Sequence, residues 1–149
     1  MENYKIIKNA VGSLEIYDPV RRKYVALTPE EKIRQHTINF LNKYLKYPYG
    51  SMGVECGVRI NKMFFRTDII ITNKKAEVVM IVECKQEEVT LTKNVEQQVL
   101  KYFRGYPSAR FLLLANGMDV RCWKILKNDD DKFSFVSVDI PFWNEINDV

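Results

Sequence analysis

Residues 66–85, RTDIIITNKKAEVVMIVECK, decide the fold. Two runs rich in β-branched residues flank the polar segment Asn73–Ala76, which predicts two strands, Met63–Thr72 and Glu77–Lys85, joined by a turn. The run VVMIVEC shows no alternation of apolar and polar residues. A strand of this kind is covered on both faces. We therefore expect it at the centre of a sheet with helices on both sides.

Three charged side chains interrupt these apolar strands, namely Asp68, Glu83 and Lys85. Burying a carboxylate is costly unless it is paired or bound to a metal. Glu83 and Lys85 are two residues apart on a strand, so they point to the same face and Cys84 points to the other. A hairpin through residues 73–76 would place Asp68 either diagonal to Glu83 or directly opposite it, at about 4.5–8 Å.

Two carboxylates at that separation can share one hard divalent cation. Mg²⁺ suits such a site, because it takes a few carboxylates and keeps water and phosphate oxygens as its other ligands; Mn²⁺ is the alternative. Lys85 would then lie beside the metal, where it could hold an attacking water or offset charge on a phosphate. Asp68 and Glu83 are thus the predicted metal ligands of a site suited to phosphodiester hydrolysis.

Length and composition exclude several other classes of protein. A chain of 149 residues fits one domain, so residues 1–149 are expected to form a single unit. His36 is the sole histidine, which excludes mechanisms that need two within the chain. There is no GxxxxGK[ST] loop and hence no ATP site. The net charge of +4 favours polyanions only mildly.

Cysteine usage and hydropathy bear on the compartment. Cys56, Cys84 and Cys122 form no CxxC pair, which argues against a zinc site and fits a reducing cytosol. The start of the chain, MENYKIIKNA, has no apolar leader segment, and the apolar runs are too short to span a bilayer. We therefore expect a cytoplasmic protein without membrane segments.

Helix and strand signals surround the central hairpin. Thr28, Pro29 and Glu31 form the start of a helix that should reach about Leu45, with its inward stripe at Ile33, Thr37, Phe40, Leu41 and Tyr44. A second helix is expected over Leu91–Arg104, with Thr92 as the N-cap. Further strands are expected at two places within 14–26 and at Val54–Ile60, Phe111–Ala115, Val120–Leu126 and Phe133–Ile140. This order predicts an α/β fold with a mixed central β-sheet flanked by helices.

The aspartate at the start of a hairpin, followed by an apolar strand that ends in Glu-x-Lys, resembles the PD-(D/E)xK nuclease superfamily. The matching residues are Asp68 and Glu83-Cys84-Lys85, with Thr67 in place of the proline. The resemblance implies a restriction-endonuclease-like fold and metal-dependent cleavage, with DNA as the partner. It also implies that the backbone carbonyl of Cys84 is a metal ligand.

A second motif narrows the resemblance. Gln98 and Tyr102 form a QxxxY pattern on the second helix, similar to the N-terminal domain of type I restriction enzyme R (motor) subunits. The resemblance implies that Gln98 and Tyr102 support the site or contact the substrate. Helical spacing places Gln98 on the inward stripe with Val95, Val99 and Tyr102. The resemblance also allows a homodimer or a larger restriction-type complex.

The first helix resembles the Pro-Glu-Glu…Arg start of the same domain. This implies that Glu31, chosen over Glu30, adds a third acid to the metal site, and that Arg34 pairs with a carboxylate or a phosphate. The capping box of Thr28 and Glu31 is the competing explanation for Glu31.

Other interpretations remain open for the charged residues. Asp68, Glu83 and Lys85 could form a purely structural cluster, and the chain would then be a catalytically silent nucleic-acid-binding or assembly module. Seven basic residues either line a groove for phosphates or are simply solvated: Arg59, Lys62, Arg66, Lys93, Lys101, Arg104 and Arg110.

Overall fold

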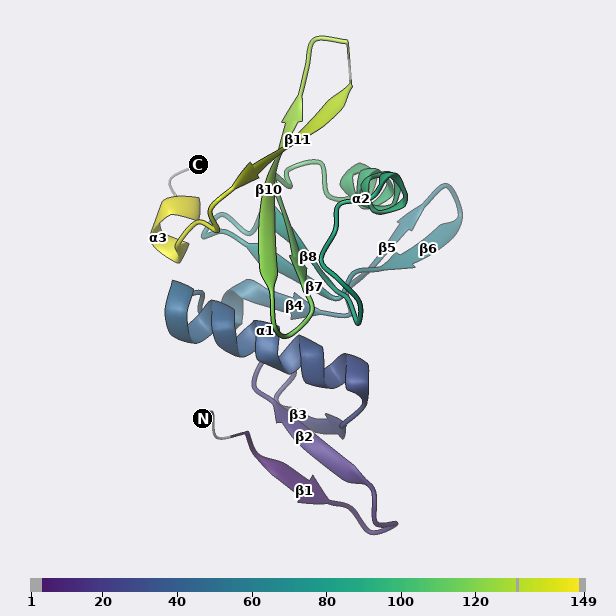
Figure 1. Cartoon of the computed structure of the whole chain (residues 1–149), viewed down its shortest axis with the longest axis vertical. Helices are drawn as coiled ribbons and strands as arrows, with labels where there is room; N and C mark the ends of the chain where they lie inside the picture. The colour runs from purple at the N-terminus through teal and green to yellow at the C-terminus, as the bar shows by residue number, and fades with distance from the viewer. Residues whose placement is uncertain (1–3, 131, 148–149) are drawn as a thin grey trace.

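The computed structural model describes residues 4–130 and 132–147. A six-stranded mixed sheet forms its centre (Figure 1). In spatial order the strands are β11 (Phe133–Val138), β10 (Val120–Lys127), β9 (Phe111–Ala115), β8 (Val78–Cys84), β7 (Ile69–Thr72) and β4 (Met52–Val54). β8 and β9 are parallel, and all other neighbours are antiparallel. The predicted α/β fold class with a mixed sheet is thereby confirmed.

Helices α1 (Pro29–Leu45) and α2 (Lys93–Gly105) cover opposite faces of this sheet. Met80 and Val82 of β8 pack in one core cluster with Ile38 of α1, whereas Ile81 packs in another with Tyr102 of α2. Neighbouring residues of a strand point to opposite faces, so the unbroken apolar run of β8 has the two-sided cover that its sequence predicts.

Both helices begin where the sequence predicts. The Oγ1 atom of Thr28 accepts a hydrogen bond from the N–H of Glu31 at 3.0 Å, and Oγ1 of Thr92 accepts one from the N–H of Val95 at 3.2 Å. Each bond satisfies one of the free N–H groups that every helix start presents. α1 ends at Lys46, whose φ of 68° is left-handed.

The predicted inward stripe of α1 was partly wrong. Tyr44 is exposed, and Ile33 and Phe40 are only half-buried. The buried face instead consists of Glu31, Arg34, Gln35, Thr37, Ile38, Leu41 and Leu45. The first half of this face is polar and is stabilised by ion pairs, and hydrophobic periodicity cannot detect such a face.

Two predicted strands are each divided in the structure. The expected strand Val54–Ile60 is split between β4 and β5 (Gly57–Ile60), and Met63–Thr72 is split between β6 (Met63–Arg66) and β7. Glu55 lies at the break with a left-handed φ of 52°, which turns the chain. β5 and β6 form a separate two-stranded hairpin that projects beside α2 (Figure 1).

The remaining elements lie around this core. β1 (Ile6–Lys8), β2 (Leu14–Asp18) and β3 (Lys23–Ala26) form an antiparallel three-stranded sheet next to α1 (Figure 1). The sequence predicts β2 and β3 but not β1, the 3₁₀ turn η1 (Tyr49–Ser51) or α3 (Trp143–Ile146). Within residues 4–130 and 132–147, no helix is both long and apolar enough to cross a membrane.

Candidate active site

The register of the central hairpin brings the two predicted metal ligands together. Ile69 pairs with Val82 and Ile70 with Ile81, so the next pair outward places Asp68 directly opposite Glu83. This is one of the two arrangements that the sequence allows. Oδ2 of Asp68 also accepts a hydrogen bond from the N–H of Cys84 at 2.8 Å, which fixes the carboxylate against the end of β8.

Glu83 is a partly buried acid with an unusual environment. Its Oε1 is shielded from solvent and has no hydrogen-bond partner within the described part of the chain. Burial raises the pKa of Glu83 to about 9, assisted by the charge of Asp68 and by the hydrogen bond between the two carboxyl groups. Glu83 therefore holds a proton at neutral pH in the metal-free protein. A buried carboxyl oxygen without a partner is rare and marks a position suited to a cation.

The donor set at this point fits a hard cation. Asp68 and Glu83 offer carboxylate oxygens, and the carbonyl of Cys84 is the backbone oxygen that the sequence resemblance implies. Among the described residues there is no group of three or more His, Cys, Asp or Glu side chains placed to hold a metal. A cation held by two carboxylates keeps positions open for water and phosphate, and this suits Mg²⁺ or Mn²⁺ better than a closed zinc site.

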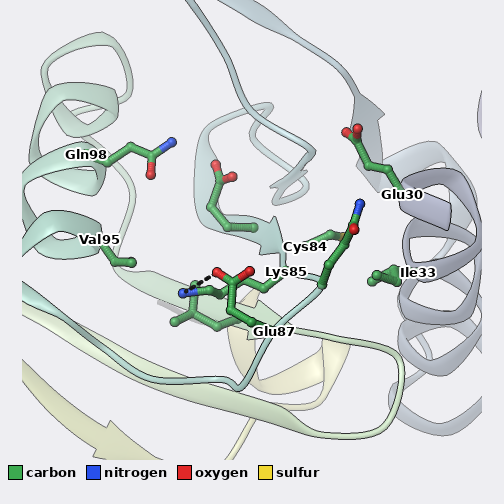
Figure 2. Close-up of a pocket in the computed structure, with 10 residues that line it drawn as sticks. Glu30, Ile33, Cys84, Lys85, Glu87, Val95 and Gln98 are labelled. Atoms are coloured by element: carbon green, nitrogen blue, oxygen red, sulfur yellow. Dashed lines mark ion pairs between the residues drawn. The ribbon is translucent and has the colours of Figure 1, made fainter.

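A pocket opens beside Glu83, between α1 and α2. Figure 2 shows Glu30 and Ile33 entering it from α1, Val95 and Gln98 from α2, and Lys85 from the end of β8. Its lining comprises Glu30, Ile33, Glu83, Cys84, Lys85, Gln86, Glu87, Val95, Gln98 and Leu114. Glu83 and Lys85 thus share one open site, as their spacing on the strand predicts.

Lys85 is mostly buried but keeps a weak ion pair. Its Nζ lies 3.5 Å from Oε1 of Glu87, whose side chain is 75% exposed (Figure 2). An ion pair with such an exposed partner contributes little to stability. Lys85 is therefore able to exchange Glu87 for another anion in the pocket, such as a phosphate.

The QxxxY residues are joined to each other beside this site. Nε2 of Gln98 donates a hydrogen bond to Oη of Tyr102 at 2.8 Å. Tyr102 is buried, and its pKa is raised by burial and then by the charge of Glu83, which places the phenol near the carboxylates. The expectation that Gln98 lies on the buried stripe was wrong, because Gln98 lies at the edge of that stripe, where it faces the open pocket.

Comparison with known families covers all of these residues. Residues 29–141 match the family model described as "Type I restriction enzyme R protein N terminus". The chain belongs to this family. The resemblance inferred from Asp68, Glu83-Cys84-Lys85 and the QxxxY pair is thereby confirmed.

A crystal structure of a DUF820 protein from Anabaena variabilis ATCC 29413, provisionally named a nuclease, is similar with a TM-score of 0.43 at 10% identity, over 90% of this chain and 89% of that one. No curated protein sequence matches this chain significantly.

Glu31 takes part in a buried ion-pair network. Its Oε1 accepts from Arg21 at 2.6 Å and from Arg34 at 2.7 Å, and its Oε2 accepts from Gln35 at 3.1 Å. Both oxygens are thus engaged, and Arg34 connects Glu31 to Asp68. Its role as a metal ligand remains a prediction that requires these partners to be released. Glu30, which the sequence analysis set aside, lines the pocket instead.

Arg34 is the centre of this network. Its Nη2 donates to Oδ1 of Asp68 at 3.2 Å, to Oε1 of Glu30 at 3.0 Å and to Oε1 of Glu55 at 3.3 Å. The sequence suggested a carboxylate partner for Arg34 but not which one. Glu55 belongs to no recognised sequence motif, so its contact with Arg34 is seen only in the folded chain.

Arg21 extends the network to the N-terminal sheet. It lies in the turn between β2 and β3 and pairs with Asp18 as well as with Glu31. Asp18 is fully buried. The small sheet is therefore linked through Arg21 and Glu31 to the arginine that contacts Asp68, a link that no local sequence pattern indicates.

Proposed function

We propose that this domain is a metal-dependent nuclease that hydrolyses phosphodiester bonds in DNA, with Mg²⁺ as the cofactor and Mn²⁺ as a substitute. The observation that carries the proposal is the pair of facing carboxylates, Asp68 and Glu83, with the unpartnered Oε1 of Glu83 beside Lys85 in an open pocket. Membership of a restriction-enzyme family supports DNA as the substrate class.

Each residue of the site has a distinct part in this proposal. Hydrogen bonds from the N–H of Cys84 and from Arg34 hold the carboxylate of Asp68 in position. Glu83 must lose its proton before it can act as a ligand. When bound, Mg²⁺ would lower the pKa of a water molecule and polarise the phosphate. Lys85 would leave Glu87 and place its Nζ against the phosphate or the attacking water.

Gln98 and Tyr102 complete the α2 side of the proposed site. The side chain of Gln98 faces the pocket and holds Tyr102 by a hydrogen bond, so it can contact a substrate and support the site. Tyr102 is enclosed by the core, and its proposed role is to hold Gln98 in place. Hydrolysis forms the bond between the water oxygen and phosphorus and breaks one ester P–O bond, and the leaving oxygen takes up a proton.

The test is a cleavage assay with matched lysine variants. Purified protein is incubated with plasmid and with single-stranded DNA, in Mg²⁺, Mn²⁺ or EDTA. Lys85→Ala is compared with Lys75→Ala, which removes an exposed lysine from the turn at the other end of β8. We expect metal-dependent cleavage by the wild type and by Lys75→Ala, and none by Lys85→Ala.

Other outcomes point elsewhere. If the protein cleaves no DNA and no divalent ion raises its melting temperature, the result would favour the catalytically silent binding or assembly module. Inert protein that binds Mg²⁺ or Mn²⁺ would indicate that cleavage requires a further subunit of a restriction-type complex, or a second copy of this chain.

A further inference from the structure

The β5–β6 hairpin is a basic arm that the proposed chemistry does not use. Residues 57–66, GVRINKMFFR, contain three cationic residues and no acidic one. Arg59, Lys62 and Arg66 are all exposed. The hairpin projects from the central sheet next to α2 (Figure 1). The arm thus presents only positive charge to a partner.

The hairpin ends in a tight turn. Ile60 pairs with Met63 across a two-residue turn in which Asn61 and Lys62 both have left-handed φ values, 49° and 67°. This is the turn geometry that best fits a twisted hairpin.

Backbone hydrogen bonds continue from the hairpin to Asp68, the proposed metal ligand. The N–H of Thr67 donates to the carbonyl of Cys56, and the N–H of Glu55 donates to the carbonyl of Asp68, each at 3.0 Å. These two backbone hydrogen bonds therefore fix the position of the arm relative to Asp68.

The two faces of the hairpin differ. One face packs on α2 through Phe65, whose ring lies 6.1 Å from that of Tyr102, and Nζ of Lys101 lies 6.0 Å from the same ring. Cross-strand pairing places Arg59 beside Phe64 and Gly57 beside Arg66. These two pairs share the opposite face, because alternate residues of a strand point the same way.

Phe64 is exposed on that face yet held in position. Its ring lies over Gly57, where a Cβ atom would come within 1.9 Å of Cζ of the ring. The guanidinium of Arg66 lies 5.7 Å from the ring centroid. Phe64 is 56% exposed, and Met63 at the tip is 60% exposed. A large apolar side chain fixed in solvent between cations is typical of a contact surface.

We propose that this arginine–phenylalanine face of the β5–β6 hairpin binds the duplex DNA that the Asp68–Glu83 site would cut; the proposal rests on the proposed nuclease function. Arg59, Lys62 and Arg66 would contact phosphates, which supply most of the affinity of proteins for DNA. A two-stranded β-ribbon fits the major groove, and Phe64 on this face would contact sugars and base edges there. The absence of acidic residues from the arm favours a polyanion over a protein partner.

The test measures binding without cleavage. A short fluorescein-labelled duplex is titrated in EDTA with wild type, with the double variant Arg59→Ser/Lys62→Ser, and with the control Lys124→Ser/Lys132→Ser. The control removes the same charge from exposed positions on and next to the β10–β11 hairpin. We expect the hairpin variant to bind the duplex at least about tenfold more weakly than the wild type. The slope of log Kd against log salt concentration should fall by about 2 in this variant. The control should bind like the wild type.

A second variant tests the placement of Phe64. Gly57→Ala keeps every charge but fills the space under the ring, so Phe64 must move. We expect weaker DNA binding by Gly57→Ala, and weaker binding still by Phe64→Ser. Circular dichroism and thermal melting confirm that each variant is folded.

The outcomes separate the two proposals. If the hairpin variant binds as tightly as the control with the same salt slope, the DNA-binding role of the arm is overturned, while Mg²⁺-dependent cleavage by the wild type still supports the nuclease. The exposed Met63 and Phe64 would then fit a protein partner. If the wild type binds no duplex but still cleaves single-stranded DNA, only the arm proposal fails. If it neither binds duplex nor cleaves, and no Mg²⁺ or Mn²⁺ binds to it, both proposals fail.

Discussion

Arg34 on α1 donates from Nη2 to Oδ1 of Asp68 at 3.2 Å, and this bond ties the first helix to the acid at the end of the central sheet. The other oxygen of Asp68 accepts from the N–H of Cys84. Arg34 is 2% exposed, so the contact lies away from solvent. The helix thus orients one proposed metal ligand through a guanidinium group.

Removal of Arg34 should destabilise the fold. Arg34→Met leaves Glu31 and Asp68 without their shared cation, and the loss of one partner from a buried ion pair costs about 3 kcal/mol. Urea unfolding at pH 7 measures the change. Lys32→Met, at an exposed position of the same helix, is the control and should change the free energy of unfolding by less than about 0.5 kcal/mol. Equal stability of the two variants would show that the network contributes nothing.

Glu83→Gln should stabilise the metal-free protein at neutral pH. The pKa of Glu83 is about 9 in the folded chain and near 4.5 when unfolded. Between these values the unfolded state releases a proton that the folded state retains, so the wild type loses stability as pH rises. Glutamine carries no such proton. We expect Glu83→Gln to gain up to about 3 kcal/mol at pH 7 and nothing near pH 4.

The measurement is thermal melting in EDTA at pH 4, 6 and 8. The gain in melting temperature should grow with pH. A constant difference between Glu83→Gln and wild type across this range would contradict the raised pKa of Glu83.

Metal binding should strengthen with pH for the same reason. A cation at Asp68 and Glu83 must displace the proton of Glu83, so its apparent affinity should increase by up to about tenfold per pH unit between pH 6 and 8. Calorimetric titration with Mn²⁺ at pH 6, 7 and 8 measures this affinity. Asp68→Asn should abolish binding, whereas Asp119→Asn, at an exposed site beyond β9, should not. Binding that is independent of pH would place the cation elsewhere.

Gln98 and Tyr102 should differ in their effect on stability. Gln98→Ala removes an exposed side chain and should alter the free energy of unfolding by less than about 0.5 kcal/mol while it reduces cleavage. Tyr102→Ala removes a ring that packs with Ile81 and Phe65, and should cost about 3 kcal/mol or more. Chemical denaturation and the plasmid assay together check both. Loss of stability in Gln98→Ala would show that its role is mainly structural.

The sequence by itself determined the local elements and the candidate chemistry. The strand–turn–strand segment with Asp68 and Glu83-x-Lys85, and the caps at Thr28 and Thr92, follow from patterns that span a few neighbouring residues. Strand alternation also predicted that Glu83 and Lys85 share a face. These features depend on backbone geometry close in the chain, so a single sequence suffices to find them.

Only the tertiary structure decided which groups meet over longer distances. The choice between diagonal and opposite placement of Asp68 and Glu83 depended on the hairpin register. The turn at Glu55 divided the expected strand Val54–Ile60. The polar face of α1 is buried because Arg34 pairs with Asp68, which is distant in the chain. Phe64 is held in position because Gly57 leaves space for its ring. Such contacts are decided when the whole chain packs, and no local pattern encodes them.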